Sequence, residues 1–285
     1  MNVVVIGLSL ASALFLLSAG LTLIFGMLGV INFAHGSFYM LGAYAGYQII
    51  QLTGSFWWAL LLAPLVGGLV GAAVERLALR PVYNREPHTQ MLLTFGVILV
   101  LEEVVRAIWG LEYKEVAAPA LLAAPTHLLG ATVSTYRLFL ITFGAAMALV
   151  LFLALDRTRI GIIVRAASSN AEMVRGLGID VGRVRTGVFA FGTALAALGG
   201  AVTAPLFPVE LGMGFSVIID CFVVIIIGGL GSIKGTVVAA LLLGLVRALG
   251  YSFAPEWVDF ASYSLLILVL LSRPQGLFGR QMRTA

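Results

Sequence analysis

Long apolar stretches separated by short polar ones run along the whole chain. Nine stretches are apolar enough to lie in a membrane, and they cover residues 3–28, 38–50, 56–79, 91–109, 138–155, 184–205, 215–230, 235–251 and 260–271. A helix that spans the hydrocarbon core needs about 20 mostly apolar residues, and fewer suffice for a broken helix that is buried in protein. The pattern therefore predicts an all-α, polytopic transmembrane bundle of about eight to ten membrane segments, some of them broken or re-entrant.

The first apolar stretch resembles the central part of a signal peptide. It lacks a basic region at its start, however, and the apolar run continues to about Leu28. We therefore interpret it as the first membrane helix. No later segment has the composition of a separate soluble domain, so residues 1–285 are expected to form one transmembrane domain with a cytoplasmic loop at 156–185.

The overall composition supports the membrane class. Apolar residues make up 61% of the chain and charged residues 11%, and the mean hydropathy is +1.07, whereas a soluble domain is about a quarter charged. The net charge of +4 would suit an anionic partner such as nucleic acid. The basic residues lie in short loops without an aromatic platform, so membrane topology explains them and no nucleic acid is expected as a partner.

The distribution of Lys and Arg predicts how the chain is oriented. If the N-terminus faces outward, all but four of the 17 basic residues fall on the inner side, six of them in the loop 156–185. The four that fall elsewhere are Arg106, Lys114, Arg137 and Arg247. Inner loops of membrane proteins carry an excess of Lys and Arg. The sequence therefore predicts an N-terminus outside and a C-terminus inside.

The segment 29–37, between the first two apolar stretches, is the first candidate site. It places Asn32, His35, Gly36 and Ser37 among apolar residues. Unwound backbone at membrane depth is tolerated only where it is buried in protein or lines a watery cavity, so one interpretation is a broken helix whose polar groups face the transport pathway. A cytoplasmic turn with a hydrogen-bonded histidine explains the spacing equally well.

A glycine-rich segment in the second half of the chain is the second candidate site. Gly228, Gly229, Gly231 and Ser232 lie between two apolar stretches, and glycine permits positive φ and close backbone approach. The segment superficially resembles a phosphate-binding loop but lacks the G-x-x-x-x-G-K-[ST] pattern, so no nucleotide site is expected. Interruptions in both halves of a chain indicate the central site of a transporter. We assign both segments to the substrate pathway as a hypothesis.

The cytoplasmic loop contains a short amphipathic helix. Ser169 followed by Glu172 is typical of a capping box, Met173 adds apolar surface, and Gly178, just after Gly176, offers a left-handed stop. Such a helix rests on lipid headgroups in one interpretation. In the other interpretation, the helix projects from the membrane and docks into a cytoplasmic partner.

A few charges fall within the apolar stretches. Glu102 and Arg106 are spaced to pair at i, i+4, and Glu103 lies beside them near the outer end of the same helix. For Asp220 the sequence does not decide between a functional and a structural role. An ionisable residue at membrane depth is a functional candidate by default, and less so near the interface. None of these is a convincing midplane acid for a proton-coupled carrier.

Metal-binding and catalytic patterns find little support. His35, His88 and His127 have no ligand spacing, and the single cysteine, Cys221, excludes an internal disulfide and is expected in packing. No recognisable catalytic motif is present. The chain is therefore expected to be neither an enzyme nor a holder of a metal or cofactor.

Five stretches carry a resemblance to a known family. Residues 20–36, 41–44, 172–179, 228–232 and 273–278 resemble the permeases of branched-chain amino acid ABC importers, specifically the LivH type. The likeness runs nearly from end to end, which implies that residues 1–285 form one permease domain with its cytoplasmic coupling loop at 156–185.

This resemblance implies a solute and a set of partners. The chain would pair with a second, LivM-like permease, two cytoplasmic ATPases that use the ATP, and an external solute-binding protein, in a bacterial-type plasma (inner) membrane. By analogy, Ser169, Glu172, Met173, Gly176 and Gly178 would belong to the coupling helix that inserts into the ATPase. Branched-chain amino acids are the default solute, although related permeases serve urea, short amides or other small organic acids.

The rival class is a self-sufficient secondary carrier or channel. It predicts a buried midplane acid and function without an ATPase. The missing acid and the docking-like loop both favour the ABC permease. A membrane enzyme or a structural scaffold would need a polar cluster or a large soluble domain, and the sequence shows neither.

Overall fold

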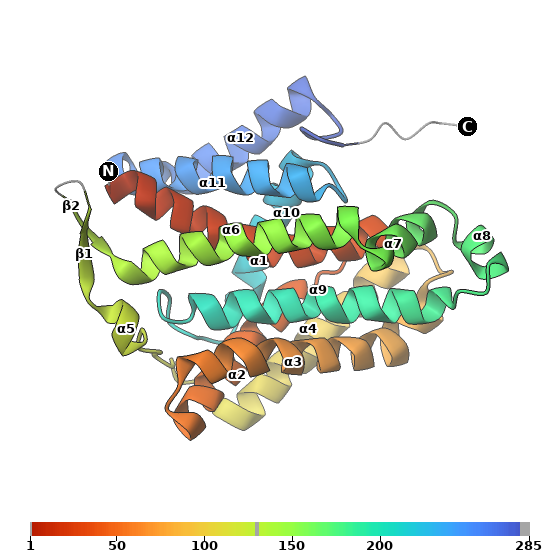
Figure 1. Cartoon of the computed structure of the whole chain (residues 1–285), viewed down its shortest axis with the longest axis horizontal. Coiled ribbons are helices and arrows are strands. Elements are labelled where there is room, and N and C mark those ends of the chain that lie inside the picture. Colours follow the sequence, from red (N-terminus) through yellow and green to blue (C-terminus); the bar gives the residue numbers. More distant parts are fainter. Residues whose placement is uncertain (1, 129–130, 280–285) are drawn as a thin grey trace.

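A computed structural model describes residues 2–128 and 131–279, and its long helices lie side by side along the longest axis of the molecule (Figure 1). The main helices are α1 (Asn2–Leu28), α2 (His35–Thr53), α3 (Phe56–Val74), α4 (Pro87–Trp109), α6 (Thr135–Arg157), α7 (Arg159–Ser169), α9 (Val181–Thr203), α10 (Met213–Gly228), α11 (Ile233–Phe253) and α12 (Val258–Ser272). The shorter elements are η1 (Glu75–Leu79), η2 (Arg80–Val82), α5 (Ala120–Ala123), β1 (Pro125–Leu128), β2 (Ala131–Ser134), α8 (Ala171–Gly176) and η3 (Pro255–Trp257).

The nine apolar stretches all form helices, so the all-α, polytopic prediction is confirmed. Six helical spans in the described residues are long and apolar enough to cross a membrane by length and composition: α1, α3 with η1 and η2, α6, α9, α11, and η3 with α12. The α10 helix has only 16 residues, and α2 and α4 carry more polar side chains. The two-stranded antiparallel hairpin β1–β2 was not anticipated.

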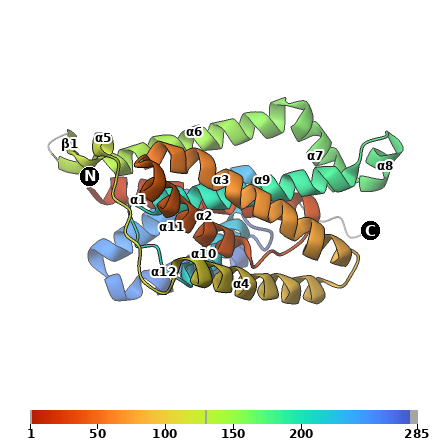
Figure 2. The same cartoon turned by 90° about the horizontal axis from the view of Figure 1, so that it is seen from below.

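The α1 and α9 helices form the centre of the bundle. In their most apolar windows, 61% of α1 and 78% of α9 is buried, against 17% of α6 and 17% of α12. Helices α2 and α3 pack on α9, while α6 and α11 pack on α1. Figure 2 shows α6 and α4 along opposite edges of the molecule.

Small residues allow this close packing around α9. A side chain added at Gly42 of α2 or at Gly67 of α3 would overlap Ala197 of α9, which is fully buried. Lipid tails supply no hydrophobic force between helices, so close backbone approach and dispersion must hold them together. Small residues at these positions therefore allow α2 and α3 to approach α9 closely.

The connection between α1 and α2 returns into the bundle. Gly29 turns the chain with a φ of 68°, and α2 then begins at His35, whose ring contacts the carbonyl of Leu17 in the middle of α1. The next residue, Gly36, lies in backbone contact with Gly214 in the first turn of α10. The α2 helix therefore begins inside the bundle and in contact with the first turn of α10, which is an arrangement typical of broken helices.

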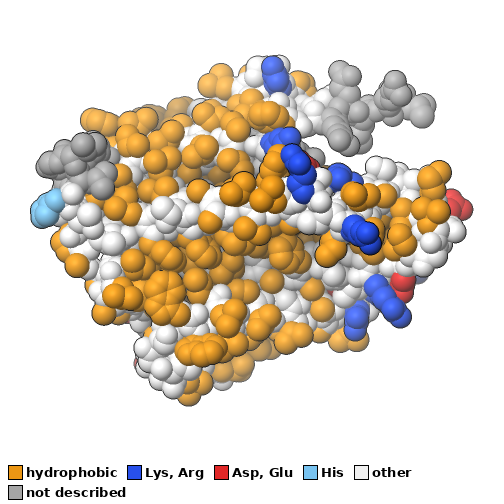
Figure 3. Space-filling view, in the orientation of Figure 1, with side chains coloured by type: hydrophobic (Ala, Val, Ile, Leu, Met, Phe, Trp, Pro, Cys, Tyr) orange, Lys and Arg blue, Asp and Glu red, His pale blue; other side chains and the backbone are white. Residues whose placement is uncertain are grey.

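The two ends of the bundle differ in chemistry. The α7 and α8 helices project at one end, here named the α8 end, while the hairpin and the first residues of α1 lie at the other (Figures 1 and 2). On the face in Figure 3, Lys and Arg side chains gather in the half toward the α8 end.

Candidate functional site

The polar residues of the first interruption lie inside the protein, beside the middle of α1. Asn32 and His35 are fully buried. The Asn32 side-chain oxygen accepts a hydrogen bond from the Ala34 amide at 3.1 Å, and Nε2 of His35 lies 2.9 Å from the Leu17 carbonyl oxygen. Because a carbonyl only accepts, Nε2–H is the donor. These bonds fix the turn from which α2 starts.

Two buried nitrogens at this turn lack a partner among the described residues. They are Nδ2 of Asn32 and Nδ1 of His35. A buried polar group left unpaired costs about 1–3 kcal/mol, and such groups occur where water or a ligand supplies the bond. The broken helix therefore retains unused hydrogen-bonding capacity inside the bundle.

The first turns of α2 and α10 meet beside these residues. A side chain at Gly36 would overlap the carbonyl of Gly214, and Ser37 is buried next to it. The N-terminal end of a helix carries a partial positive charge. Two such ends at one place in a low-dielectric interior favour a negatively charged group between or beside them.

The glycine-rich segment forms the end of α10 and the start of α11. Gly229 and Gly231 have φ angles of 99° and 80°, which glycine adopts without strain. The Gly228 carbonyl accepts a hydrogen bond from the Phe278 amide at 3.0 Å, and Oγ of Ser232 caps α11 by accepting from the amide three residues on at 3.2 Å. The segment thus ends one helix, starts the next and holds the stretch that follows α12.

The structure does not bring the two predicted segments together. Gly231 lies against Gly26 near the end of α1, whereas His35 lies against Leu17. Leu17 and Gly26 are nine positions apart on α1, which corresponds to a rise of roughly 13 Å. The first segment is at the middle of the bundle and the second is at the α8 end.

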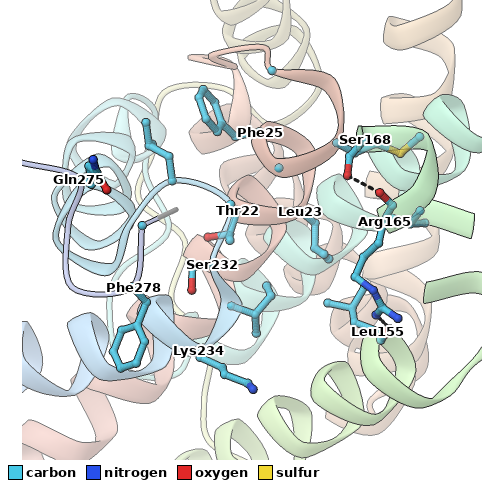
Figure 4. Close-up of a pocket in the computed structure, with 18 of the residues that line it drawn as sticks. Thr22, Leu23, Phe25, Leu155, Arg165, Ser168, Ser232, Lys234, Gln275 and Phe278 are labelled. Atoms are coloured by element: carbon cyan, nitrogen blue, oxygen red, sulfur yellow. Dashed lines mark hydrogen bonds between the residues drawn. The ribbon is translucent and has the colours of Figure 1, made fainter. Parts of the chain in front are cut away.

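Gly231 and Ser232 instead line a cavity of about 870 Å³ at the α8 end. Its walls are the end of α1, the last turns of α6, the α7 helix, the segment 230–234 and the stretch after α12 (Figure 4). Arg165 and Lys234 also line it. Sequence analysis did not anticipate this cavity because its walls come from parts of the chain that are far apart in sequence.

The predicted amphipathic helix exists, but its cap is not the predicted one. Ser169 is the last residue of α7, and the side chain of Asn170 caps α8 by accepting from the Met173 amide at 2.9 Å. The capping box of Ser169 with Glu172 is therefore wrong. Asn170 replaces it because its extended backbone separates the two helices and places its side chain over the first turn of α8.

The other end of α8 agrees with the prediction. Gly178 has a φ of 81° and donates its amide to the Arg175 carbonyl at 2.9 Å, while Ile179 donates to the Val174 carbonyl at 3.3 Å. This pair of bonds is a Schellman motif, which needs a left-handed residue after the helix. The stop at Gly178 is confirmed.

The α8 helix has one anchored face and one free face. Val174 is buried in a cluster with Met27 of α1 and Val181 of α9, whereas Met173 and Leu177 are 67% and 75% exposed. Glu172 and Gly176 are exposed as well. The arm formed by α7 and α8 therefore presents polar and apolar groups outward while it stays tied to the two central helices.

Sequence reasoning missed a buried carboxylate at the α8 end. Glu75 is fully buried and accepts hydrogen bonds from the hydroxyls of Tyr83 at 2.9 Å and Thr186 at 2.7 Å. Its carboxylate also lies 3.5 Å from Arg80. Burial, with the charge of Glu75, raises the pKa of Tyr83, so the phenol stays protonated as a donor. This cluster joins the end of α3 to the first turns of α9.

Asp220 is neutralised by a partner on the next helix. The carboxylate of Asp220 receives both terminal nitrogens of Arg247, at 2.5 and 2.6 Å, and both side chains are more than four-fifths buried. Asp259 lies 3.7 Å from the same guanidinium. A carboxylate held in a two-pronged ion pair is a poor proton carrier, so Asp220 gives the secondary-carrier class no support.

The charges on α4 pair differently from the prediction. Arg106 donates to Glu103 at 2.7 Å, three residues earlier, so the expected pair with Glu102 is wrong. Glu103 and Arg106 are both more than half exposed, and their short pair satisfies the guanidinium at the surface. In the described residues, no three His, Cys, Asp or Glu side chains lie close enough together to hold a metal ion.

Comparison with known proteins identifies the family. Residues 3–270 match the family described as the permease component of the branched-chain amino acid transport system. The chain is 33% identical over 96% of its length to LivH of Escherichia coli strain K12, a high-affinity branched-chain amino acid transport permease, of which 94% is covered. It is 32% identical to the corresponding permease BraD of Pseudomonas aeruginosa, with 96% of this chain and 94% of BraD covered.

A more distant relative is LivM of Escherichia coli strain K12, 25% identical over 92% of this chain and 67% of LivM. No solved structure matches the chain. The extent of the family match and of the identity to LivH is decisive: the chain belongs to the permease component family of branched-chain amino acid transport systems. It is a multi-pass membrane permease of the ABC importer class.

Proposed function

We propose that this protein is one of two permease subunits of an importer that moves branched-chain amino acids with energy from ATP. The observation that carries the proposal is the arm of α7 and α8, which projects at one end of the bundle with Met173 and Leu177 exposed. Exposed apolar groups beside charged ones are typical of a surface that a partner covers. The near full-length likeness to LivH and BraD supports the solute class.

The partners follow from the same class. A LivM-like permease completes the channel, two cytoplasmic ATPases bind the arms, and an external binding protein delivers the solute. ATP is bound by the ATPases, so this chain needs no cofactor of its own. The location is a bacterial-type inner membrane, with the α8 end and the C-terminus in the cytoplasm, supported by the gathering of Lys and Arg at that end.

The anchored face of α8 suggests how a movement of the ATPase is transmitted to the helix bundle. Glu172, Met173, Gly176 and their neighbours contact the ATPase, and Val174 transmits its movement to the ends of α1 and α9. Nucleotide shifts the conformational equilibrium because the ATPase pair binds it differently in its open and closed forms. The bundle then alternates between outward and inward openings while this chain performs no chemistry.

The broken helices give a pathway for an amino acid. The N-terminal ends of α2 and α10, around Gly36 and Ser37, favour the carboxylate of the solute. Asn32 and His35 add the unpaired nitrogens described above, and they become accessible when the bundle opens. Gly228, Gly229, Gly231 and Ser232 lie at the inner mouth, where positive φ angles allow the α10–α11 connection to bend.

The coupling role is tested by replacing Glu172 and Gly176 together with Arg. The reconstituted complex should lose ATPase stimulation by the loaded binding protein, and uptake should fall to background, because two bulky cations would block the docking face. Glu256→Arg, at an exposed position at the opposite end of the bundle, is the matched control and should leave both unchanged. A double variant that keeps normal stimulation would contradict the proposal.

The orientation is tested by labelling. Arg175→Cys, made in a Cys221→Ser background, places a single thiol on the exposed arm. In intact cells a membrane-impermeant maleimide should leave it unlabelled, and it should react fully once the membrane is opened. Labelling of this thiol from the outside would put the arm out of reach of a cytoplasmic ATPase.

The solute and the energy source are tested by uptake. Vesicles with the whole complex should accumulate labelled leucine only with internal ATP, and excess isoleucine or valine should compete. Competition by urea or acetamide instead would move the solute to the amide-transporting relatives. Accumulation by the permeases alone, driven by an ion gradient, would favour a secondary carrier.

A further inference from the structure

Two cations, Arg165 and Lys234, line the 870 Å³ cavity beside the last turns of α6. Arg165 donates to the Leu155 carbonyl and lies 3.5 Å from Asp156. Nζ of Lys234 lies 5.0 Å from the centre of the Phe152 ring. Because Phe152 lies three and four residues before Leu155 and Asp156, these groups share one face of α6. Figure 4 shows Arg165 and Lys234 extending into the cavity from separate helices.

This group of charges has an excess of positive charge. Asp156 offsets one of the two cations, and in the part of the chain that the structure describes no carboxylate lies within 4.0 Å of Lys234. Lys234 also lies in the first turn of α11, where the partial positive charge of the helix end disfavours a cation. An anion bound in the cavity would offset the excess positive charge and would stabilise Lys234 at the positive end of α11.

The rest of the cavity is suited to hydrocarbon. Leu23 of α1, Ile233 of α11 and Phe152 of α6 line it beside the cations. The α6 and α11 helices both pack against α1, and α6 is among the least buried spans of the bundle. Lys234 is exposed and Phe152 is 36% exposed, so the cavity can be reached from the flank that α6 presents to the bilayer.

We propose that this cavity binds an anionic phospholipid. Arg165 and Lys234 hold the phosphate of the headgroup, and the acyl chains lie along the apolar surface of α1, α6 and α11. Basic cavities between membrane helices near the headgroup level are suited to such lipids. A free phosphate would match the cations but would leave the apolar wall without a partner. The inference needs only the membrane location of the chain and does not rest on the proposed solute or on ATP coupling.

The experiment measures lipid retained by the purified permease complex. The complex is incubated in detergent with phosphatidylglycerol or phosphatidylcholine, and bound lipid is counted by native mass spectrometry. The wild type should retain phosphatidylglycerol preferentially. Lys234→Gln and Arg165→Gln should each weaken retention about fivefold, as expected for one cation near a membrane surface, and the double variant should lose the preference.

Matched variants separate lipid binding from folding and from general charge. Lys234→Arg keeps the cation and should keep the preference, while Arg183→Gln removes an exposed arginine at the same end of the bundle, outside the cavity, and should change nothing. Equal retention of both lipids by the wild type would overturn the proposal. Displacement of phosphatidylglycerol by excess inorganic phosphate would overturn it too, as would loss of ATPase binding in Lys234→Gln with lipid retention intact.

Discussion

At the scale of single residues, the buried carboxylate of Glu75 should contribute to the stability of the α8 end. Glu75→Ala removes the acceptor of the half-buried Tyr83 hydroxyl, while the Thr186 hydroxyl keeps the Gly182 carbonyl as a partner. Leaving the Tyr83 donor unpaired costs about 1–3 kcal/mol, so the variant should unfold at a lower temperature in detergent. Glu86→Ala removes an exposed carboxylate on the same side of the bundle and should have little effect. Equal melting temperatures for the two variants would refute the role of Glu75.

The ion pair of Asp220 with Arg247 makes a second prediction at this scale. Arg247→Met leaves a carboxylate in the bundle without its partner, which costs about 3–5 kcal/mol for a buried pair. Removing both charges in Asp220→Leu with Arg247→Met avoids that penalty, so the double variant should be more stable than the single one. The test is a double-mutant cycle on thermal unfolding in detergent. Additive losses would show that the two side chains do not act as a pair.

At the scale of elements, the cap of α8 can be tested against the sequence-based prediction. Asn170→Ala removes the oxygen that accepts from the Met173 amide and should cost about 1 kcal/mol. Ser169→Ala changes the last residue of α7, which makes no cap, and should cost far less. Hydrogen exchange at the amides of α8 should speed up only in Asn170→Ala. Faster exchange in Ser169→Ala instead would restore the predicted capping box.

The sequence predicted the positions of the helices more accurately than the contacts that their side chains make. Apolar length alone located nine stretches that form helices, because the bilayer imposes long apolar runs on the segments that cross it. The cap of α8 failed because Ser169 and Asn170 are both good caps, and only the backbone between α7 and α8 decides which one is used. Glu75 was overlooked because a carboxylate next to Arg76 at the end of an apolar stretch is also typical of a solvated helix end. Its partner Thr186 is 111 residues away.

At the scale of the whole molecule, the two candidate regions lie at different depths. The sequence identified both interruptions but could not say that the first returns to the middle of α1 while the second stays at the α8 end, because depth depends on which helices pack together. Contacts such as His35 with Leu17 and Gly231 with Gly26 decide it. In the mechanism proposed above, a conformational change that starts at the arm has to travel along α1 and α9 to reach the broken helices. That transmission requires close packing of these helices.

That requirement leads to a prediction about two glycines in helix interiors. Gly42→Leu would force α2 away from Ala197 of α9, because even a methyl group at this position overlaps the α9 backbone. Gly96→Leu, on α4, meets open space, with no atom within 4 Å of the added carbon. Both changes bring a similar gain in helix propensity, so the difference between them isolates packing.

Gly42→Leu should lose at least about 1–3 kcal/mol of stability and abolish transport, while Gly96→Leu should retain its stability and its transport activity. The measurements are thermal unfolding of the purified complex and leucine uptake in vesicles. A Gly42→Leu protein that melts and transports like Gly96→Leu would mean that the α2–α9 contact does not hold the bundle together.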